Sequence, residues 1–150
     1  MLEEKDIHVI LVNEKDEPIG TASKLDAHTS GDRHRAFSLF LFNSKGQMLL
    51  QKRALSKYHS PGLWTNACCS HPYPEEATKT AVKRRLHEEL GMTVSDPIKQ
   101  FEFIYNAKLD QGMTEHEFDH VYTAVSDEQP KPNPNEVCDT TYVDMKDLKM

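Results

Sequence analysis

The chain has 150 residues, of which 37% are hydrophobic and 28% charged, and its formal net charge is −6. The length favours one domain, residues 1–150, and the acidic balance gives no electrostatic reason to bind nucleic acid or an anionic membrane. No apolar run approaches the roughly 20 residues that span a bilayer, and the N-terminus lacks the basic start of a signal peptide, so we expect a cytoplasmic protein with no membrane partner.

Six strands are predicted along the chain. Their apolar or β-favouring runs cover residues 7–13, 36–43, 47–53, 99–109, 115–125 and 140–145. Gly46 supplies the turn of a hairpin between the second and third strands. Residues 14–20 are predicted as a turn, and residues 126–136 as a polar loop rich in proline.

The strongest helix signal lies at residues 74–91, and a second helix is expected to start at 144–150. Pro74 and two acids open the long helix, and Gly91 closes it. Its apolar residues recur at helical spacing: Ala77, Ala81, Val82, Leu86 and Leu90. Strands, one long helix and further strands predict a mixed α/β fold of the α+β kind.

The three cysteines argue against a disulfide framework. Cys68 and Cys69 are neighbours, a pairing that would be strained, and Cys138 leaves an odd count. Free thiols fit a reducing compartment, and three cysteines are too few for a Cys₄ zinc site.

The long helix carries charged residues that approximate the Nudix box, G-x5-E-x7-R-E-U-x-E-E-x-G-U, in which U is aliphatic. The matching positions are Glu76, Arg84, Leu86, Glu88, Glu89, Gly91 and Met92, while Ser70 and Arg85 replace the first Gly and the Glu after the Arg. Carboxylates three or four residues apart share a helix face and can hold a divalent cation that bridges diphosphate oxygens. Arg85 removes one carboxylate and adds a guanidinium suited to phosphate. A solvated face with Arg–Glu pairs is the alternative interpretation.

Three histidines and two carboxylates form a candidate ligand set for a divalent metal. The residues are His28, His34, His71, Glu115 and Glu117. Glu115 and Glu117 would project from one face of a strand, where two like charges repel unless a cation relieves them. The set suits Mg²⁺, Mn²⁺ or Zn²⁺. Exposed histidines and carboxylates on an edge strand are the alternative, because the spacing alone does not make these residues converge.

Five segments together resemble the type I isopentenyl diphosphate isomerases, a branch of the Nudix superfamily. The segments HRAFSLFLFN, KRALSK, PGLWTNACCSHP, RRLHEELGM and TEHEFDHVY occur in that order within a resemblance that runs from about His8 to Leu148. Ordinary Nudix hydrolases lack the combination of WTN-x-C-x-HP with a later E-x-E. The resemblance implies a Nudix fold, a mixed β-sheet sandwiched by helices. It also implies interconversion of isopentenyl and dimethylallyl diphosphate in isoprenoid biosynthesis by protonation and deprotonation.

The resemblance further implies a role for each matching residue. Cys69 and Glu117 fall on the catalytic pair, and Tyr105 on the tyrosine that positions the glutamate. The implied metal ligands are His28, His34, His71, Glu115 and Glu117. Glu89 and the Cys69 carbonyl would serve a second Mg²⁺ that binds with the substrate. The implied diphosphate-binding residues are Lys24, Arg53, Lys57 and Arg85. Trp64 is a candidate for lining the pocket around a carbocation, with a core aromatic as the alternative.

Three features depart from the resembled family. The loop between His28 and His34 is one residue shorter than in many members, which makes His34 the firmer prediction. Cys68 is an extra thiol that we expect to point away from Cys69. Family members usually continue for a few dozen residues, with a Trp that covers the substrate, whereas this chain ends at Met150.

Because the chain lacks the tail that the resembled family usually has, two other functions and two assembly states remain open. A Nudix-type hydrolase of nucleoside diphosphate derivatives is one alternative, and an inactive short form that binds a metal and a diphosphate is the other. Apolar surface left uncovered would favour self-association, so a monomer or a weak homodimer is expected.

Overall fold

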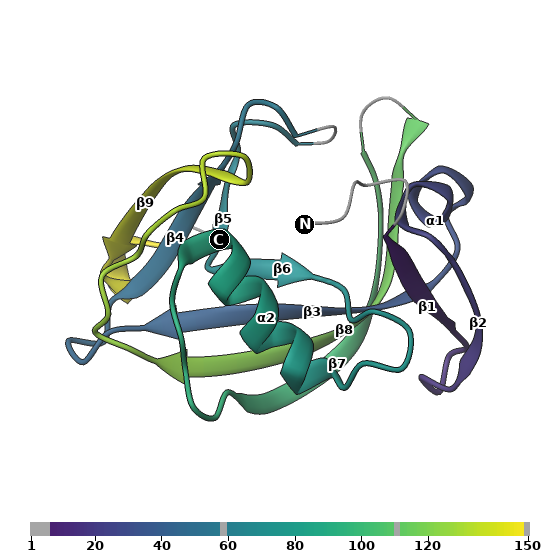
Figure 1. Ribbon diagram of the computed structural model, residues 1–150, viewed down its shortest axis with the longest axis horizontal. Helices are drawn as coiled ribbons and strands as arrows, with labels where there is room; N and C mark the ends of the chain where they lie inside the picture. Colours follow the sequence, from purple (N-terminus) through teal and green to yellow (C-terminus); the bar gives the residue numbers. More distant parts are fainter. Residues whose placement is uncertain (1–6, 58–59, 110–111, 149–150) are drawn as a thin grey trace.

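The computed structural model describes residues 7–57, 60–109 and 112–148 (Figure 1). The strands are β1 His8–Val12, β2 Pro18–Ser23, β3 His34–Phe42, β4 Met48–Arg53, β5 Trp64–Asn66, β6 Cys68–Ser70, β7 Ile98–Lys108, β8 Thr114–Val125 and β9 Val137–Val143. The helices are α1 Lys24–Ser30 and α2 Thr78–Leu90, with a 3₁₀ turn at Met145–Asp147. The predicted mixed α+β class is confirmed.

The strands join one mixed sheet that is built around β3. Its main path runs β2-β1-β3-β4-β5, and β3 also pairs with β6 and β8, while β7 pairs with β8 and β9 with β4. The β3–β8 pair is parallel and places His34 opposite Glu117 at one end and Phe42 opposite Val125 at the other. The sheet therefore brings together two residues that are far apart in the sequence.

Helix α2 covers one side of the sheet and supplies much of the core (Figure 1). Its buried apolar residues are Ala81, Val82, Leu86 and Leu90, and they pack with Leu39, Leu41 and Leu49 of β3 and β4. Full burial of each such leucine contributes about 1.5–3 kcal/mol. Gly91 ends the helix in the left-handed region, at φ 62°, and its N–H donates to the His87 carbonyl. Among the described residues, no helix has both the length and the apolar character that crossing a membrane requires.

Helix α2 begins four residues later than the predicted start at Pro74. Glu75 has a left-handed φ of 68°, which a helix does not allow. The Glu76 N–H donates to the Tyr73 carbonyl, and the Glu76 carboxylate accepts from the Tyr73 N–H. A closed turn thus precedes the helix, and Ala77 is its exposed N-cap rather than a core residue.

The other differences from the prediction lie in short or weakly patterned segments. Residues 18–20, the second part of the predicted turn, belong instead to strand β2, because β1 pairs with this proline- and glycine-containing edge. Helix α1 was not predicted, although Ser23 caps it by accepting from the Asp26 N–H. Strands β5 and β6 have three residues each, too few for a periodic signal, and β9 starts three residues early. The expected last helix is a 3₁₀ turn, and its residues 149–150 lie outside the described residues.

Candidate active site

Three histidines and one carboxylate converge at the end of the β3–β8 pair. His28 comes from α1, His34 opens β3, His71 follows β6, and Glu117 lies in β8. One ligand atom from each lies within 4.8 Å of the others. The Nε2 atoms of His71 and His34 are 3.2 and 3.7 Å from Glu117 Oε2. His28 remains in the group despite the shortened loop, because its ring centroid is 5.2 Å from that of His34.

The hydrogen bonds of two histidines leave a ring nitrogen available for a cation. Nδ1 of His28 lies 2.8 Å from the Lys24 carbonyl, and Nδ1 of His34 lies 3.0 Å from the Asp32 carbonyl. A carbonyl only accepts, so each Nδ1 carries the proton and each Nε2 the lone pair. Nε2 of His34 is buried and has no hydrogen-bond partner within the described ranges. An orphaned buried nitrogen among imidazoles and a carboxylate fits a divalent metal.

The protonation states of this group also favour a cation. Burial lowers the pKa of His71 to about 3, although the hydrogen bond to Glu117 opposes the shift. Burial alone would raise the pKa of Glu117, but the neighbouring His34 and His71 hold it well below its usual range. Neutral imidazoles and an ionised carboxylate are the forms that bind metals.

Glu115 shares the strand face of Glu117 but lies outside the group of four. Burial and the neighbouring charge of Glu117 raise the pKa of Glu115 to about 6. A nearby cation would therefore lower the free-energy cost of ionising the Glu115 carboxyl. The structure brings this predicted ligand to the same cavity without placing it in the cluster.

A cavity of about 360 Å³ adjoins the histidine cluster. Every residue predicted for the site lines it except His34, which is fully buried beside it. Trp64 is 45% exposed and forms part of the wall, so the alternative of a core aromatic is wrong. The lining combines polar and charged groups with the aromatic rings of Trp64, Phe103 and Tyr105.

Strand β6 turns the two adjacent cysteines in opposite directions, as expected for an extended segment. Cys68 is buried in the core, with Sγ 3.5 Å from the Glu89 carboxylate. Cys69 opens to the cavity, and its thiol donates to Asn66 Oδ1 at 3.0 Å. Although the thiol meets solvent in the cavity, the surrounding walls bury it enough to raise its pKa to about 12. All three cysteines are free.

Tyr105 lies beside the candidate catalytic glutamate, on the neighbouring strand of the sheet. The register of β7 and β8 pairs Tyr105 directly with Glu117, which places the two side chains on one face. Burial, followed by the charges of Glu115 and Glu117, raises the pKa of the Tyr105 phenol. The phenol therefore keeps its proton and can donate a hydrogen bond into the cavity.

The four predicted diphosphate-binding cations all line the cavity: Lys24, Arg53, Lys57 and Arg85. Arg85 and Glu89 are only 8% and 6% exposed, so the solvated helix face is wrong for them. Arg85 Nη2 lies 2.9 Å from Glu89 Oε2. Burial alone would lower the pKa of Arg85, but the charge of Glu89 and other anions raises it above its usual range. The guanidinium is thus held at the cavity by a buried ion pair.

Comparisons with known proteins agree with this arrangement. The NUDIX domain family matches residues 32–150. Isopentenyl-diphosphate Delta-isomerase 1 of Aromatoleum aromaticum is 50% identical over 141 residues, which are 94% of this chain and 79% of that protein. The chain belongs to the isopentenyl-diphosphate Delta-isomerases of the NUDIX family. Isomerases of Pectobacterium atrosepticum and Streptomyces griseus are 46% and 49% identical to this family member. They match 93% and 92% of its chain, and 78% and 71% of their own.

Solved structures confirm the NUDIX fold of this isomerase family member. DR0079 from Deinococcus radiodurans superposes with a TM-score of 0.74 and 26% identity, covering 91% of this chain and 83% of its own. A MutT NUDIX hydrolase from Burkholderia pseudomallei reaches a TM-score of 0.65 at 21% identity, with 79% and 88% covered. The second likeness concerns the fold alone.

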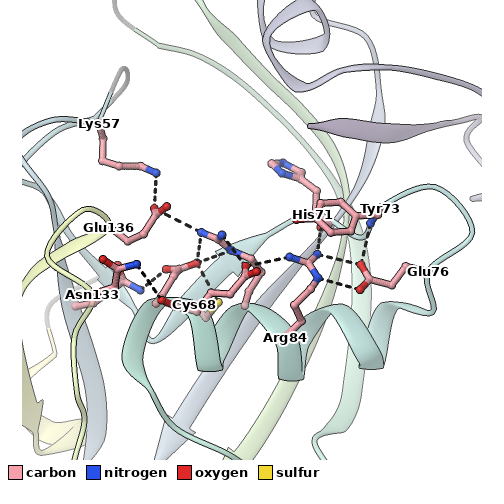
Figure 2. A network of polar contacts seen from close by, with 12 residues as sticks. Lys57, Cys68, His71, Tyr73, Glu76, Arg84, Asn133 and Glu136 are labelled. Atoms are coloured by element: carbon pink, nitrogen blue, oxygen red, sulfur yellow. Dashed lines mark hydrogen bonds and ion pairs between the residues drawn. The ribbon is translucent and has the colours of Figure 1, made fainter. Parts of the chain in front are cut away.

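In this family member, residues of the Nudix box connect α2 to the segment that precedes it. Arg84 donates twice to Glu76, with both N–O distances 2.9 Å, and its guanidinium lies 3.8 Å from the centre of the Tyr73 ring (Figure 2). Arg84 also donates to the His71 carbonyl at 3.3 Å. The box thereby ties the helix to the segment that carries His71 and Cys69.

Sequence reasoning missed two polar residues that line the isomerase cavity, Asn66 and Glu136, and one that contacts Glu89 behind it, Gln51. Asn66 holds the Cys69 thiol, and Gln51 donates to Glu89 at 2.9 Å and to the Ala67 carbonyl at 2.6 Å. Glu136, the last residue of the proline-rich loop, pairs with Lys57 at 2.6 Å. Asn66 stands in the WTN motif, which is a signal that could have been used, whereas Gln51 and Glu136 stand in no motif.

A second group of histidine and carboxylates lies on the opposite face of β8. His120 Nε2 is 2.9 Å from Asp16 Oδ2, and its Nδ1 is 3.2 Å from Glu102 Oε2. Each carboxylate approaches a different ring nitrogen of His120. Arg35 and Lys99 also pair with these carboxylates. The group is an ion-pair network that fastens the turn after β1 to the sheet.

Proposed function

We propose that the chain is an isopentenyl-diphosphate Delta-isomerase, which interconverts isopentenyl diphosphate and dimethylallyl diphosphate. The names of relatives at 45–50% identity support this function. The observation that carries it is the meeting of Cys69 and Glu117 in one cavity that is also lined by four cationic side chains. A diphosphate needs the cations, and a proton shift along an allyl group needs two separate proton-transfer groups.

In this proposal the cationic side chains bind the diphosphate, so that the short hydrocarbon chain of the substrate points toward the proton-transfer groups. Lys24, Arg53, Lys57 and Arg85 bind its oxygens. Arginine offers paired donors and lysine a compact charge, so together they match a highly charged, tetrahedral group. Fixing one end of the substrate orients its double bond and reduces the entropy lost at the reacting step.

Two groups then exchange protons with the hydrocarbon. Toward dimethylallyl diphosphate, Glu117 gives C4 a proton that it receives from the Tyr105 phenol, and the Cys69 thiolate takes a proton from C2. The reverse reaction exchanges these roles. Positive charge develops at C3 between the two transfers, and the π face of Trp64 is available to stabilise it. Asn66 keeps the Cys69 sulfur directed to the cavity through the 3.0 Å contact.

A divalent metal is expected at the cluster of His28, His34, His71 and Glu117, with Glu115 nearby. The donor set admits Mg²⁺, Mn²⁺ or Zn²⁺. A cation there supplies positive charge, which favours the anionic forms of Glu117 and Cys69. Glu89 is the candidate for a second Mg²⁺ that arrives with the diphosphate. The cytoplasmic location, the single domain and the monomer or weak homodimer stay predictions.

The direct test is product formation from isopentenyl diphosphate in the presence of Mg²⁺. Wild type is expected to make dimethylallyl diphosphate, and Cys69→Ala to lose about 10²–10⁴-fold in rate, the range for a proton-transfer group. Cys138→Ala is the matched control, because this thiol is exposed and does not line the cavity. No product from wild type, or equal activity of Cys69→Ala, would refute the proposal.

A further inference from the structure

The proline-rich segment after β8 is attached to the end of α2. The backbone N–H groups of Lys131 and Asn133 donate to the carbonyls of Leu90 and Glu89, at 2.7 and 2.8 Å. The Asn133 side chain donates to the Glu88 carbonyl at 3.3 Å. These carbonyls belong to the last helical turn and have no partner within the helix. The segment is therefore held in place by capping contacts, and its position is defined.

The same contacts place Glu136 beside two of the diphosphate-binding cations. The Glu136 N–H donates to the Asn133 carbonyl at 2.9 Å, and its carbonyl accepts from the Ala54 N–H at 3.0 Å. Its carboxylate lies 2.6 Å from Lys57 Nζ (Figure 2). It also lies 3.5 Å from Arg85 Nη2. Glu136 lines the cavity and is only 8% exposed.

The Glu136 carboxylate pairs with Lys57 and Arg85, two cations that a bound diphosphate would also contact. Burial alone would raise the pKa of Glu136, but Lys57 and Arg85 lower it, so the side chain is ionised. A buried anion within 4 Å of both cations neutralises part of their charge and repels an incoming anion. A diphosphate complexed with a divalent cation is repelled less, because the added positive charge is attracted to the carboxylate.

We propose that Glu136 is an internal counter-anion that makes the cavity select diphosphate complexed with a divalent cation over free diphosphate. The inference rests on the proposed function in one respect, the use of Lys57 and Arg85 as diphosphate ligands. Glu136 is a positioning and specificity residue in this scheme, since it acts through the two cations.

The test measures the binding of inorganic pyrophosphate by calorimetry, once with EDTA and once with Mg²⁺. Removal of the charge in Glu136→Gln is expected to tighten binding by about tenfold with EDTA, a change typical of one charge in a partly buried site. With Mg²⁺ the gain should be much smaller. A substitution that only damaged the fold would weaken binding in both conditions.

Two further variants make the outcome decisive. Asp16→Asn removes one negative charge from an ion-pair network outside the cavity and is expected to leave both affinities unchanged. Asparagine also tolerates the left-handed φ of 63° at that position. Glu136→Ala is the second cavity variant and should tighten binding in the same direction. Unchanged or weaker binding by both Glu136 variants with EDTA, or an equal gain with Mg²⁺, would overturn the inference.

Failure of this inference can be told apart from failure of the proposed function. Pyrophosphate binding requires no turnover. If wild type isomerises isopentenyl diphosphate and the Glu136 variants bind no more tightly, only the inference is wrong. If the variants bind more tightly and wild type makes no product, only the isomerase activity is wrong.

Discussion

A divalent cation is expected to stabilise the folded chain by binding His28, His34, His71 and Glu117. These groups are within 4.8 Å of one another in the folded protein, whereas an unfolded chain separates them. The fully buried His34 also gains a partner for Nε2, which lacks one among the described residues. Binding to the folded state alone shifts the folding equilibrium by mass action.

The size of the effect follows from the cation concentration and the chain length. At about 100 times the dissociation constant, the gain is about 2.7 kcal/mol. A chain of 150 residues gains about 2–4 °C in its unfolding midpoint per kcal/mol. Saturation should therefore raise the midpoint by about 5–11 °C.

The assay is a thermal unfolding series in which Mn²⁺ or Zn²⁺ is titrated into protein first treated with EDTA. His34→Asn removes a ligand and should lose most of the rise. His120→Asn is the matched control, since this buried histidine lies in the ion-pair network on the other face and should retain the rise. No rise in wild type, or an equal rise in His34→Asn, would refute the metal assignment.

Three other predictions concern the fold and the pH dependence of the site. Gly91→Ala should lower the free energy of unfolding in urea by about 1–2 kcal/mol, because φ is 62° and an added Cβ would lie 2.9 Å from Lys131 Cβ. Gly46→Ala is the control and should lower it less, because an added Cβ there would have nothing within 4 Å. Leu86→Ala should cost about 2–5 kcal/mol in the same assay, since the side chain is fully buried; a loss under about 1 kcal/mol would contradict the core described above. Mn²⁺ affinity should fall about tenfold per pH unit below about 6, because the raised pKa of Glu115 means that its proton must leave before the carboxylate can bind. Calorimetry between pH 5 and 7 measures this slope, and a flat profile would contradict the role of Glu115.

The sequence carried enough information for the main strands, the long helix and the family. Apolar runs marked the positions of β1, β3, β4, β7 and β8, and α2 kept the predicted face of Ala81, Leu86 and Leu90. These signals are local, and each depends on a few neighbouring residues. The short strands β5 and β6 were missed because three residues show no period.

The convergence of the site depends on long-range register, which local patterns do not contain. His34 meets Glu117 because β3 and β8 pair in parallel, and no feature of either segment specifies that register. The resemblance to a family supplied the site residues instead. Arg85 and Glu89 were open to interpretation as solvated because helical spacing does not reveal what covers a helix face. Glu136 was missed because its loop is brought to the cavity by backbone contacts with the end of α2 and with Ala54, which are distant in the sequence.

The central claim is that the chain moves a proton within isopentenyl diphosphate and leaves the diphosphate intact. Its most direct test is one incubation with Mg²⁺ in deuterium oxide, followed by proton and phosphorus NMR. The account predicts dimethylallyl diphosphate with deuterium in a methyl group at C4 and an unchanged diphosphate signal. Release of inorganic phosphate or pyrophosphate, or recovery of isopentenyl diphosphate without deuterium, would contradict it.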